Sequence, residues 1–262
     1  MQEIEFKFQV PVKKRKALQK AFTLLKAEPI HLAAQYFDTA DQTLAKHCIA
    51  IRRRQENDEW KQTFKAVDTA KVLSRLELEF DIAPPETTTL DLDNYKKDYS
   101  AIYKKLKRAL GLPLPTLELL FETNIQRLRV LQDVGNSTVE IALDIGKIFK
   151  EQNSVDIFEI EFELKQGSIE DLIAFIRPWV QKYQLSLDTH SKSDYGLLAV
   201  RQQSSFSAQY QTPLVLNRSS SEVEALQSIV ANCLQHLLPN ASSIARQQYS
   251  SEHVHQTRVA IR

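Results

Sequence analysis

The chain of 262 residues is 43% hydrophobic and 26% charged, which is typical of a globular protein with a sizeable core. Its formal net charge of +1 excludes a global field that would attract nucleic acid or an acidic membrane, so we expect neither as a partner. Cys48 and Cys233 fit neither a disulfide framework nor a zinc site, and the absence of an apolar signal region or bilayer-spanning run favours a cytoplasmic setting.

Strict alternation of charged and apolar residues opens the chain and recurs along its first half, and this period of two predicts strands. Residues 12–26 repeat apolar side chains at helical spacing, and residues 99–110 do so until Gly111 and Pro113 end the pattern. Asn57 and Asp58 predict the turn of a hairpin. The strands predicted in this half span residues 3–8, 32–39, 48–54, 59–67 and 73–83.

The second half begins with three more predicted strands, over residues 117–131, 138–150 and 155–165. Ser168, with Asp171 three residues on, caps a predicted helix over residues 169–183. Residues 202–221 are rich in Gln, Ser and Thr and are interpreted as a linker, followed by predicted helices over 222–238 and from 251 to 262.

These elements predict a strand-dominated α+β fold. About eight strands with few helices indicate a closed antiparallel barrel, or tunnel, with flanking helices in residues 1–201. We interpret residues 222–262 as the start of a second, helical domain that the sequence does not complete.

Seven of the predicted strands have one apolar face and one face of mixed charge, because residues i and i+2 share a face. The charged sets are Glu3, Glu5 and Lys7; Arg52 and Arg54; Lys61, Thr63 and Lys65; Arg75, Glu77 and Glu79; Arg127 and Arg129; Glu140 and Asp144; and Glu159, Glu161 and Glu163.

Two explanations fit such a face: the solvated outside of a sheet, which is the commoner case for one strand alone, or the lining of a barrel. Glu159, Glu161 and Glu163 repel one another at spacing two, and a merely solvated face gains nothing from that arrangement. The apolar faces also need cover, which amphipathic helices around residues 18–25, 102–110 and 172–180 could supply. Both features favour a charged interior.

A charged interior has a chemical use. Desolvating an ion costs on the order of several kcal/mol unless it is paired or bound to a ligand. Carboxylates bind divalent cations, while arginine and lysine bind phosphate oxygens. With only 5 glycines there is no glycine-rich phosphate loop, so side chains must hold any phosphate. A site with both kinds of charge suits a metal-chelated polyphosphate.

The triplet Glu3-x-Glu5-x-Lys7 resembles the ExExK signature of the CYTH superfamily, the triphosphate tunnel metalloenzymes. Arg53 departs from the family pattern, which has an apolar residue there, so the outward packing at that position stays open. Further elements similar to the family follow in order over residues 1–200: Tyr36-Phe37-Asp38-Thr39 with Leu44, Ile51-Arg52-Arg53-Arg54, Thr63-Phe64-Lys65, Arg75-x-Glu77-x-Glu79, Arg127-x-Arg129, Glu140 to Gly146, Glu159 to Leu164, and Ser191-Lys192-Ser193-x-Tyr195.

The resemblance implies hydrolysis of inorganic triphosphate to pyrophosphate and phosphate with Mg²⁺ or Mn²⁺, hard ions that suit oxygen ligands. It implies a supporting role for Tyr195 beside Lys192, and we expect Cys48 to pack within the barrel. The implied phosphate-binding residues are Lys7, Arg52, Arg54, Lys65, Arg127, Arg129 and Lys192. The implied metal ligands are Glu3, Glu5, Asp144, Glu159, Glu161 and Glu163, and the implied catalytic group is Glu3, Glu5, Lys7 and Lys192.

The tail from His253 to Arg262 looks like the opening of a CHAD domain, a helical module associated with polyphosphate, which makes polyphosphate a second expected ligand. His253 and His255 do not suit a helical metal pair at a spacing of two. Three alternatives stay open: adenylate cyclase or a thiamine or nucleoside triphosphatase on the same barrel, a polyphosphate-binding module without catalysis, and a barrel whose charges are only solvated.

Overall fold

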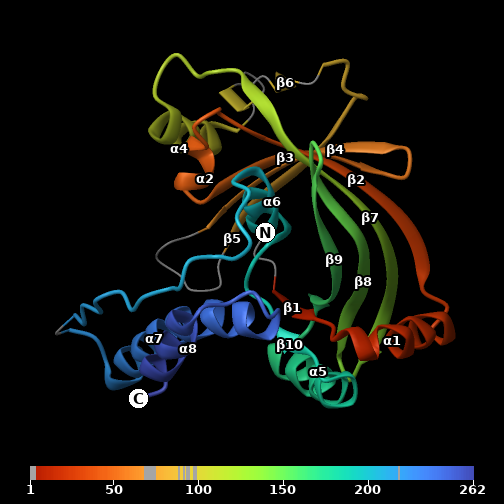
Figure 1. The fold of residues 1–262 in the computed structure, drawn as a ribbon, viewed down its shortest axis with the longest axis vertical. Coiled ribbons are helices and arrows are strands. Elements are labelled where there is room, and N and C mark those ends of the chain that lie inside the picture. Colours follow the sequence, from red (N-terminus) through yellow and green to blue (C-terminus); the bar gives the residue numbers. More distant parts are fainter. Residues whose placement is uncertain are drawn as a thin grey trace.

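The structure is a computed structural model that describes residues 4–67, 75–87, 89–90, 92, 95–96, 99–217 and 219–262. Its strands are β1 (Glu5–Gln9), β2 (Glu28–Asp38), β3 (Ile49–Glu56), β4 (Glu59–Val67), β5 (Arg75–Ile82), β6 (Thr89–Leu90), β7 (Leu117–Val134), β8 (Ser137–Lys150), β9 (Asn153–Gln166) and β10 (Ser186–Leu187). They form one curved sheet of ten strands (Figure 1) in the order β10-β1-β9-β8-β7-β2-β3-β4-β5, with β6 paired to β7.

Every pairing in the sheet is antiparallel, as predicted. The β3–β4 hairpin turns at Asn57, which has a φ of 55°, and the β7–β8 hairpin turns at Gly135, which has a φ of 60°. Asparagine and glycine tolerate this left-handed conformation better than other residues, which is why Asn57 predicted the first of these turns.

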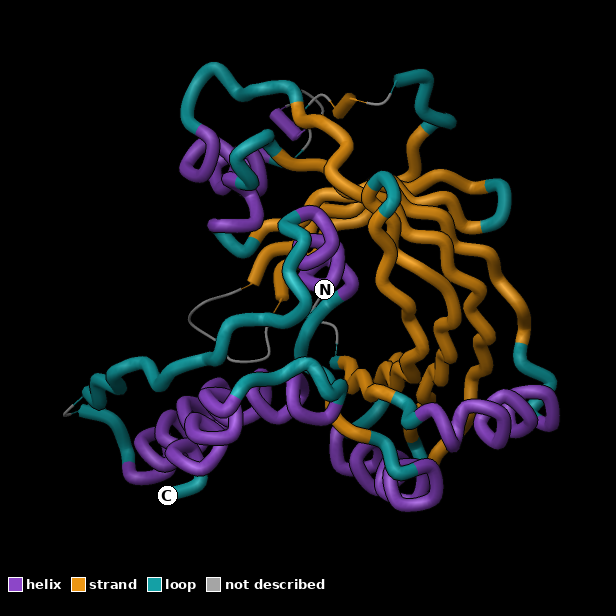
Figure 2. Tube along the Cα trace, in the orientation of Figure 1, coloured by secondary structure: helices purple, strands orange, loops and turns teal. Residues whose placement is uncertain are grey.

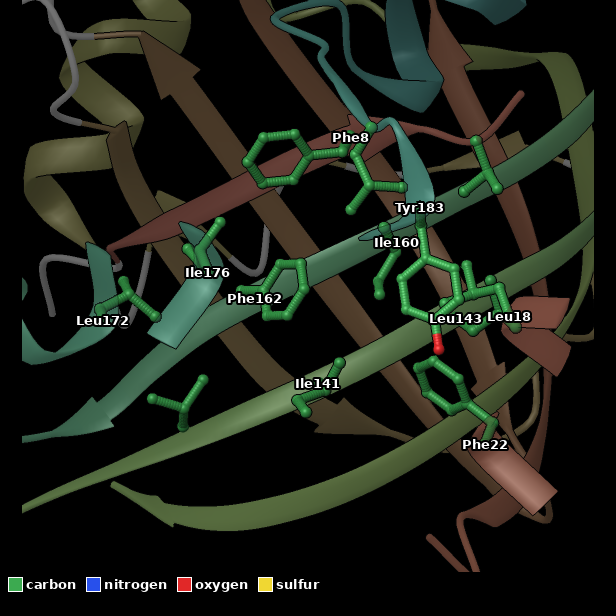
Figure 3. Close-up of a cluster of buried hydrophobic side chains, with 13 residues drawn as sticks. Phe8, Leu18, Phe22, Ile141, Leu143, Ile160, Phe162, Leu172, Ile176 and Tyr183 are labelled. Atoms are coloured by element: carbon green, nitrogen blue, oxygen red, sulfur yellow. The ribbon is translucent and has the colours of Figure 1, made fainter. Parts of the chain in front are cut away.

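Helices lie around the sheet (Figure 2), and two clusters of buried apolar residues join some of them to its strands. The largest cluster joins β1, β8 and β9 to the two helices that carry Leu18 and Leu172, and it contains the edge-to-face pair Phe8 and Phe162 at 5.9 Å (Figure 3). A second cluster places Ile102 against β3, β4 and β7. The helices predicted as cover therefore serve as cover. The described chain has the helices α1 (Val12–Leu24), α2 (Thr43–Lys46), α4 (Ser100–Leu110), α5 (Ile169–Tyr183), α6 (Lys192–Val200), α7 (Glu222–Ala245) and α8 (Ser251–Ala260).

Closure of the barrel is the point at which the fold departs from the prediction. Among the described residues no backbone pairing joins β5 to β1, so the sheet is an open path of nine strands, with β6 beside it, and not a closed ring of eight. On the edge of β1 that does not face β9, β10 pairs with Phe8 and Gln9. The strand-dominated antiparallel α+β fold with flanking helices is confirmed. Glu3 and the first two residues of the strand predicted at 73–83 lie outside the described residues.

Two side chains resolve questions left by the sequence. Arg53 points to the outward face of β3, where its guanidinium lies 5.2 Å from the ring centre of Phe37 and donates to the carbonyl of Thr87 at 3.0 Å. A long arginine can cover an apolar surface while its head group stays solvated, so the packing there is intact. Cys48 is exposed, with a φ of 55° just before β3, and its predicted place within the barrel is wrong.

Helix α7 runs seven residues beyond the predicted end at Leu238. Proline usually ends a helix, and Pro239 lies within this one. Asn240 and Ser242 directly after it are fully buried and hydrogen-bonded to the linker and to residues around β10, so tertiary packing continues the helix past the proline.

Within the described chain, none of the helices combines the length and apolarity that a bilayer crossing requires.

Candidate functional site

Antiparallel register brings the charged faces of β1, β9, β8 and β7 together. Lys7 lies opposite Glu161, and Arg127 lies opposite Asp144. Asp144 in turn lies opposite Glu159. Directly paired residues point to the same face of a sheet, so these side chains share one surface.

Three carboxylates form the centre of this surface. Oxygen atoms of Asp144, Glu159 and Glu161 lie within 4.8 Å of one another, and all three residues are buried. Arg127 makes a bidentate contact with Asp144 at 2.7 Å for both hydrogen bonds, and its Nη2 also donates to Glu161 at 2.5 Å. The planar guanidinium therefore holds two of the carboxylates in fixed orientations.

Lys192 reaches the same carboxylates from the first residue of α6. Its Nζ lies 2.7 Å from Asp144 and 2.8 Å from Glu161, and it also pairs with Glu159. A capping box begins the helix. The Asp194 carboxylate accepts from the backbone N–H of Ser191 at 2.7 Å, and the Ser191 hydroxyl accepts from the backbone N–H of Asp194 at 3.2 Å. This local signal fixes where the lysine enters the site.

Lys7 completes the central group. Its Nζ lies 3.3 Å from Glu159 and donates to the backbone carbonyl of His190. Burial works against the charge of Lys7, but Glu159 and Asp188 outweigh it, and the net effect raises the pKa of Lys7.

The ionised forms of the central groups stabilise one another. Burial opposes the charges of Arg127 and Lys192, yet the carboxylates beside them raise both pKa values well above the ordinary range. Burial likewise opposes ionisation of Asp144 and Glu161, but Lys192 and Arg127 lower the pKa of both. At neutral pH the cluster is a set of balanced, desolvated ions.

Glu5 differs from its neighbours. The side chain keeps contact with water, while desolvation by the surrounding walls and repulsion from Glu161 raise its pKa to about 7. The positive charges of Lys65 and Lys192 oppose this increase. Near neutral pH, Glu5 is therefore poised between its neutral and charged forms.

A second basic group extends the site onto β3, β4 and β5. Arg54 lies 3.2 Å from Glu79, and Lys65 lies 2.8 Å from Glu77. Arg52 donates to the Tyr36 hydroxyl at 3.3 Å. Burial works against a lower pKa for Tyr36, but the charge of Arg52 outweighs it, and the pKa falls.

The remaining predicted residues lie further from the centre. Arg129 contacts Glu28 at 3.2 Å and Glu56 at 3.8 Å, and about a third of its side chain is exposed. Glu163 pairs with Lys165 at 2.6 Å and does not join the three central carboxylates.

Sequence reasoning missed several participants. Glu77 and Glu79 were placed on the charged face but received no role, although both pair with predicted phosphate-binding cations. Asp188 and His190 were not predicted at all, since they lie between β10 and α6, where no strand or helix period marks an inward side chain. Lys61 belongs to the same basic group, 3.9 Å from Glu79.

The chemistry of this cluster fits a divalent cation. Asp144, Glu159 and Glu161 offer only oxygen atoms as ligands. Hard ions such as Mg²⁺ and Mn²⁺ prefer oxygen ligands, whereas zinc commonly takes nitrogen and sulfur ligands. Glu5 lies beside Glu161, so a fourth carboxylate is within electrostatic reach. The neighbouring lysines and Arg127 would keep these ligands deprotonated, as metal binding demands.

This chain is similar to a known protein family and to a relative of known name. Residues 1–194 match the family model described as the CYTH domain. An inorganic triphosphatase from Haemophilus influenzae is 33% identical over 202 residues, covering 76% of this chain and 55% of that protein, so the chain spans about half the length of this relative.

Two solved structures share the fold. A Hippeastrum protein, described as an adenylyl cyclase candidate with a dominant triphosphatase activity, superposes with a TM-score of 0.53 at 19% identity, over 77% of this chain and 96% of that one. An adenylate cyclase candidate from Bacillus halodurans gives 0.51 at 20% identity, over 74% and 96%. At this identity the likeness concerns architecture alone.

Proposed function

The chain belongs to the CYTH domain family, and on that premise we propose that it hydrolyses inorganic triphosphate to pyrophosphate and phosphate with the help of Mg²⁺ or Mn²⁺. The observation that carries the proposal is the buried cluster in which Arg127, Lys192 and Lys7 face three carboxylates. The name of the Haemophilus influenzae relative supports the choice of substrate.

The basic residues have the chemistry to bind the substrate. Triphosphate is a compact polyanion, so its oxygens can replace carboxylates as partners of the cations. Guanidinium groups bind phosphate oxygens in pairs, while lysines act as point charges. We assign phosphate binding to Lys7, Arg52, Arg54, Lys65, Arg127, Arg129 and Lys192.

The carboxylates released by that exchange would hold the metal. A bound divalent cation would neutralise phosphate charge and lower the pKa of water. We assign its ligands to Glu3, Glu5, Asp144, Glu159, Glu161 and Glu163, with Glu3 outside the described residues.

Glu5 can also accept a proton in the reaction. In the metal-free protein the pKa of Glu5 is about 7, near the pH at which a general base works best. The attacking water would lose a proton to Glu5 as its oxygen bonds to a terminal phosphorus. The bond from that phosphorus to the bridging oxygen breaks, and pyrophosphate leaves with its charge stabilised by the lysines and arginines.

A substrate panel tests this function. Tripolyphosphate, ATP and thiamine triphosphate would each be incubated with Mg²⁺, Mn²⁺ or Ca²⁺, and phosphate release would be measured. We expect tripolyphosphate to be cleaved fastest, and only with metal. Preference for ATP or thiamine triphosphate would move the activity to another substrate class, and binding without release in every condition would contradict hydrolysis.

We further propose that residues 1–201 form the catalytic domain, that 202–221 link it to the helical residues 222–262, and that the protein works in the cytoplasm.

The helical residues resemble the start of a CHAD domain, so inorganic polyphosphate is the ligand to test on them. Retention of the full chain on immobilised polyphosphate while tripolyphosphate saturates the site would support this role, and loss of retention under that condition would contradict it.

A further inference from the structure

The segment between β10 and α6 forms one wall of the site and is tied twice to Lys7. The backbone N–H of Asp188 donates to the Lys7 carbonyl at 2.8 Å, and the Lys7 side chain donates to the carbonyl of His190. Asp188 is buried, and its carboxylate accepts from the His190 N–H at 3.0 Å and from the Tyr195 hydroxyl at 2.8 Å. Lys192 follows directly in the chain, so the same segment positions both lysines.

The end of α7 packs against this segment (Figure 1). Ser242 is fully buried, and its hydroxyl accepts from the N–H of Thr189 at 3.2 Å and lies 3.2 Å from the carbonyl of Leu187. The Ser242 carbonyl accepts from the side chain of Gln9 on β1 at 3.1 Å. One helical residue therefore connects β1, β10 and the segment that follows β10.

Arg246 lies one turn further along the same face of α7. Its guanidinium is 4.1 Å from the ring centre of Tyr195, and its Nη2 donates to the carbonyl of Asp156 on β9 at 2.9 Å. The Tyr195 hydroxyl donates to the carboxylate of Asp188, and the backbone N–H of Asp188 donates to the carbonyl of Lys7. A continuous path of contacts thus leads from α7 to the centre of the site.

We propose that Ser242 and Arg246 are positioning residues, through which helix α7 sets the placement of Lys7 and Lys192 for triphosphate binding. The inference deepens the proposed function and rests on it for the identity of the ligand. Lysine side chains lose much rotamer freedom when fixed, so a wall that holds them ready preserves affinity. The electrostatics agree: desolvation of Asp188 is outweighed by Lys7 and His190, and the pKa of Asp188 falls below its usual range.

Variants of the full chain test the proposal. Arg246→Ala removes the guanidinium from Tyr195 and from the Asp156 carbonyl, and Ser242→Ala removes the hydroxyl that accepts from Thr189. Arg246→Lys keeps the charge over Tyr195, and Arg258→Ala removes an exposed arginine from α8 as a matched control. Calorimetry with tripolyphosphate and Mg²⁺ should show affinity about tenfold weaker for Arg246→Ala. Arg246→Lys should recover part of it, and Arg258→Ala should equal the wild type.

A second measurement needs no ligand. Labelling of Lys7 and Lys192 by an amine-reactive reagent, followed by mass spectrometry, should rise several-fold in Arg246→Ala and Ser242→Ala. Unchanged labelling and affinity in both variants, at an unchanged melting temperature, would overturn the inference. Loss of affinity in Arg246→Lys equal to that in Arg246→Ala would overturn the role assigned to the charge over Tyr195. If the wild type fails to hydrolyse tripolyphosphate, the proposed function fails, while the labelling still decides the role of α7.

Discussion

Asp144 shows how the site balances its charges at the scale of single residues. It is fully buried and is shared by Arg127, in a bidentate contact, and Lys192. Neither cation is stable in a desolvated place without such a partner. The carboxylate therefore has a structural role before any ligand arrives.

Asp144→Asn should destabilise the fold, because two buried cations would lose one of the carboxylates that they share and the cluster would keep an uncompensated positive charge. We expect a loss of about 3–5 kcal/mol in the free energy of unfolding, measured by urea denaturation. Asp156→Asn is the control: its carboxylate pairs with Lys147 at 3.5 Å on an exposed surface, where such pairs contribute about 1 kcal/mol or less. Equal stabilities for the two variants would contradict the burial argument.

Glu5 gives the site a dependence on pH. Its pKa of about 7 in the folded protein exceeds the ordinary value of 4.5, so the folded state binds this proton more tightly. The contribution of Glu5 to stability is present below pH 4.5 and is lost as the pH rises through about 7.

Metal-free denaturation curves between pH 5 and pH 8 should show this loss in the wild type. Glu5→Gln removes the titrating group, so its stability should fall less over the same range. Because water reaches Glu5, screening reduces the size of the effect, and we predict its sign only. Parallel profiles for the two proteins would show that Glu5 keeps its ordinary pKa.

At the scale of elements, α6 lies unusually close to the sheet. A Cβ on Gly196 would sit 2.2 Å from the ring of Phe121, and this ring is buried and stacked on Tyr36 at 4.5 Å. The ring has little room to move, so only glycine permits this approach. The approach matters for function because α6 begins with Lys192.

Gly196→Ala should push α6 away from β7 and weaken both stability and triphosphate binding. Overpacking of this kind costs about 1–3 kcal/mol, which thermal or urea denaturation can measure. Gly135→Asn is a suitable control, because asparagine tolerates the φ of 60° there and the nearest atom to a Cβ is 3.6 Å away. A Gly196→Ala protein with normal stability and affinity would show that α6 can shift freely.

The spacing of apolar residues and the turn residues predicted most helices and strands of the fold. The charged sets of β1, β7, β8 and β9 lie on one face because side-chain alternation in a strand is geometric, and the predicted gathering of Glu5, Arg127 and Glu161 followed from it. The sequence predicted a closed barrel, and the open sheet could not be foreseen, because closure depends on which edges meet and the two-residue β10 has no pattern to reveal it. Asp188 and His190 were missed for the same reason: their positions come from tertiary contacts.

At the scale of the whole molecule, a net charge of +1 conceals strong local segregation. The basic residues of β1, β3, β4 and β7, with Lys192 of α6, line one surface together with the carboxylates of β5, β8 and β9. Such a surface attracts small polyanions at short range, while salt screens it beyond roughly 8 Å. Selectivity therefore comes from the site and not from the overall field.

Binding of triphosphate with metal should stabilise the whole fold, because a ligand held only by the native state adds about 2.7 kcal/mol at a hundred times its dissociation constant. We expect tripolyphosphate with Mg²⁺ to raise the melting temperature by several degrees in a thermal shift assay. Orthophosphate at matched ionic strength should not do so, and a chelator should reverse the rise. An equal rise with orthophosphate would point to a general salt effect.

The most direct test of the account compares phosphate release from tripolyphosphate by the wild type and by Glu5→Gln, with Mg²⁺ present and circular dichroism confirming that both are folded. The account predicts metal-dependent release by the wild type and a loss of about a hundredfold or more in the variant, because the amide can neither accept the proton nor supply a charged ligand. Release by Glu5→Gln at close to the wild-type rate would contradict it.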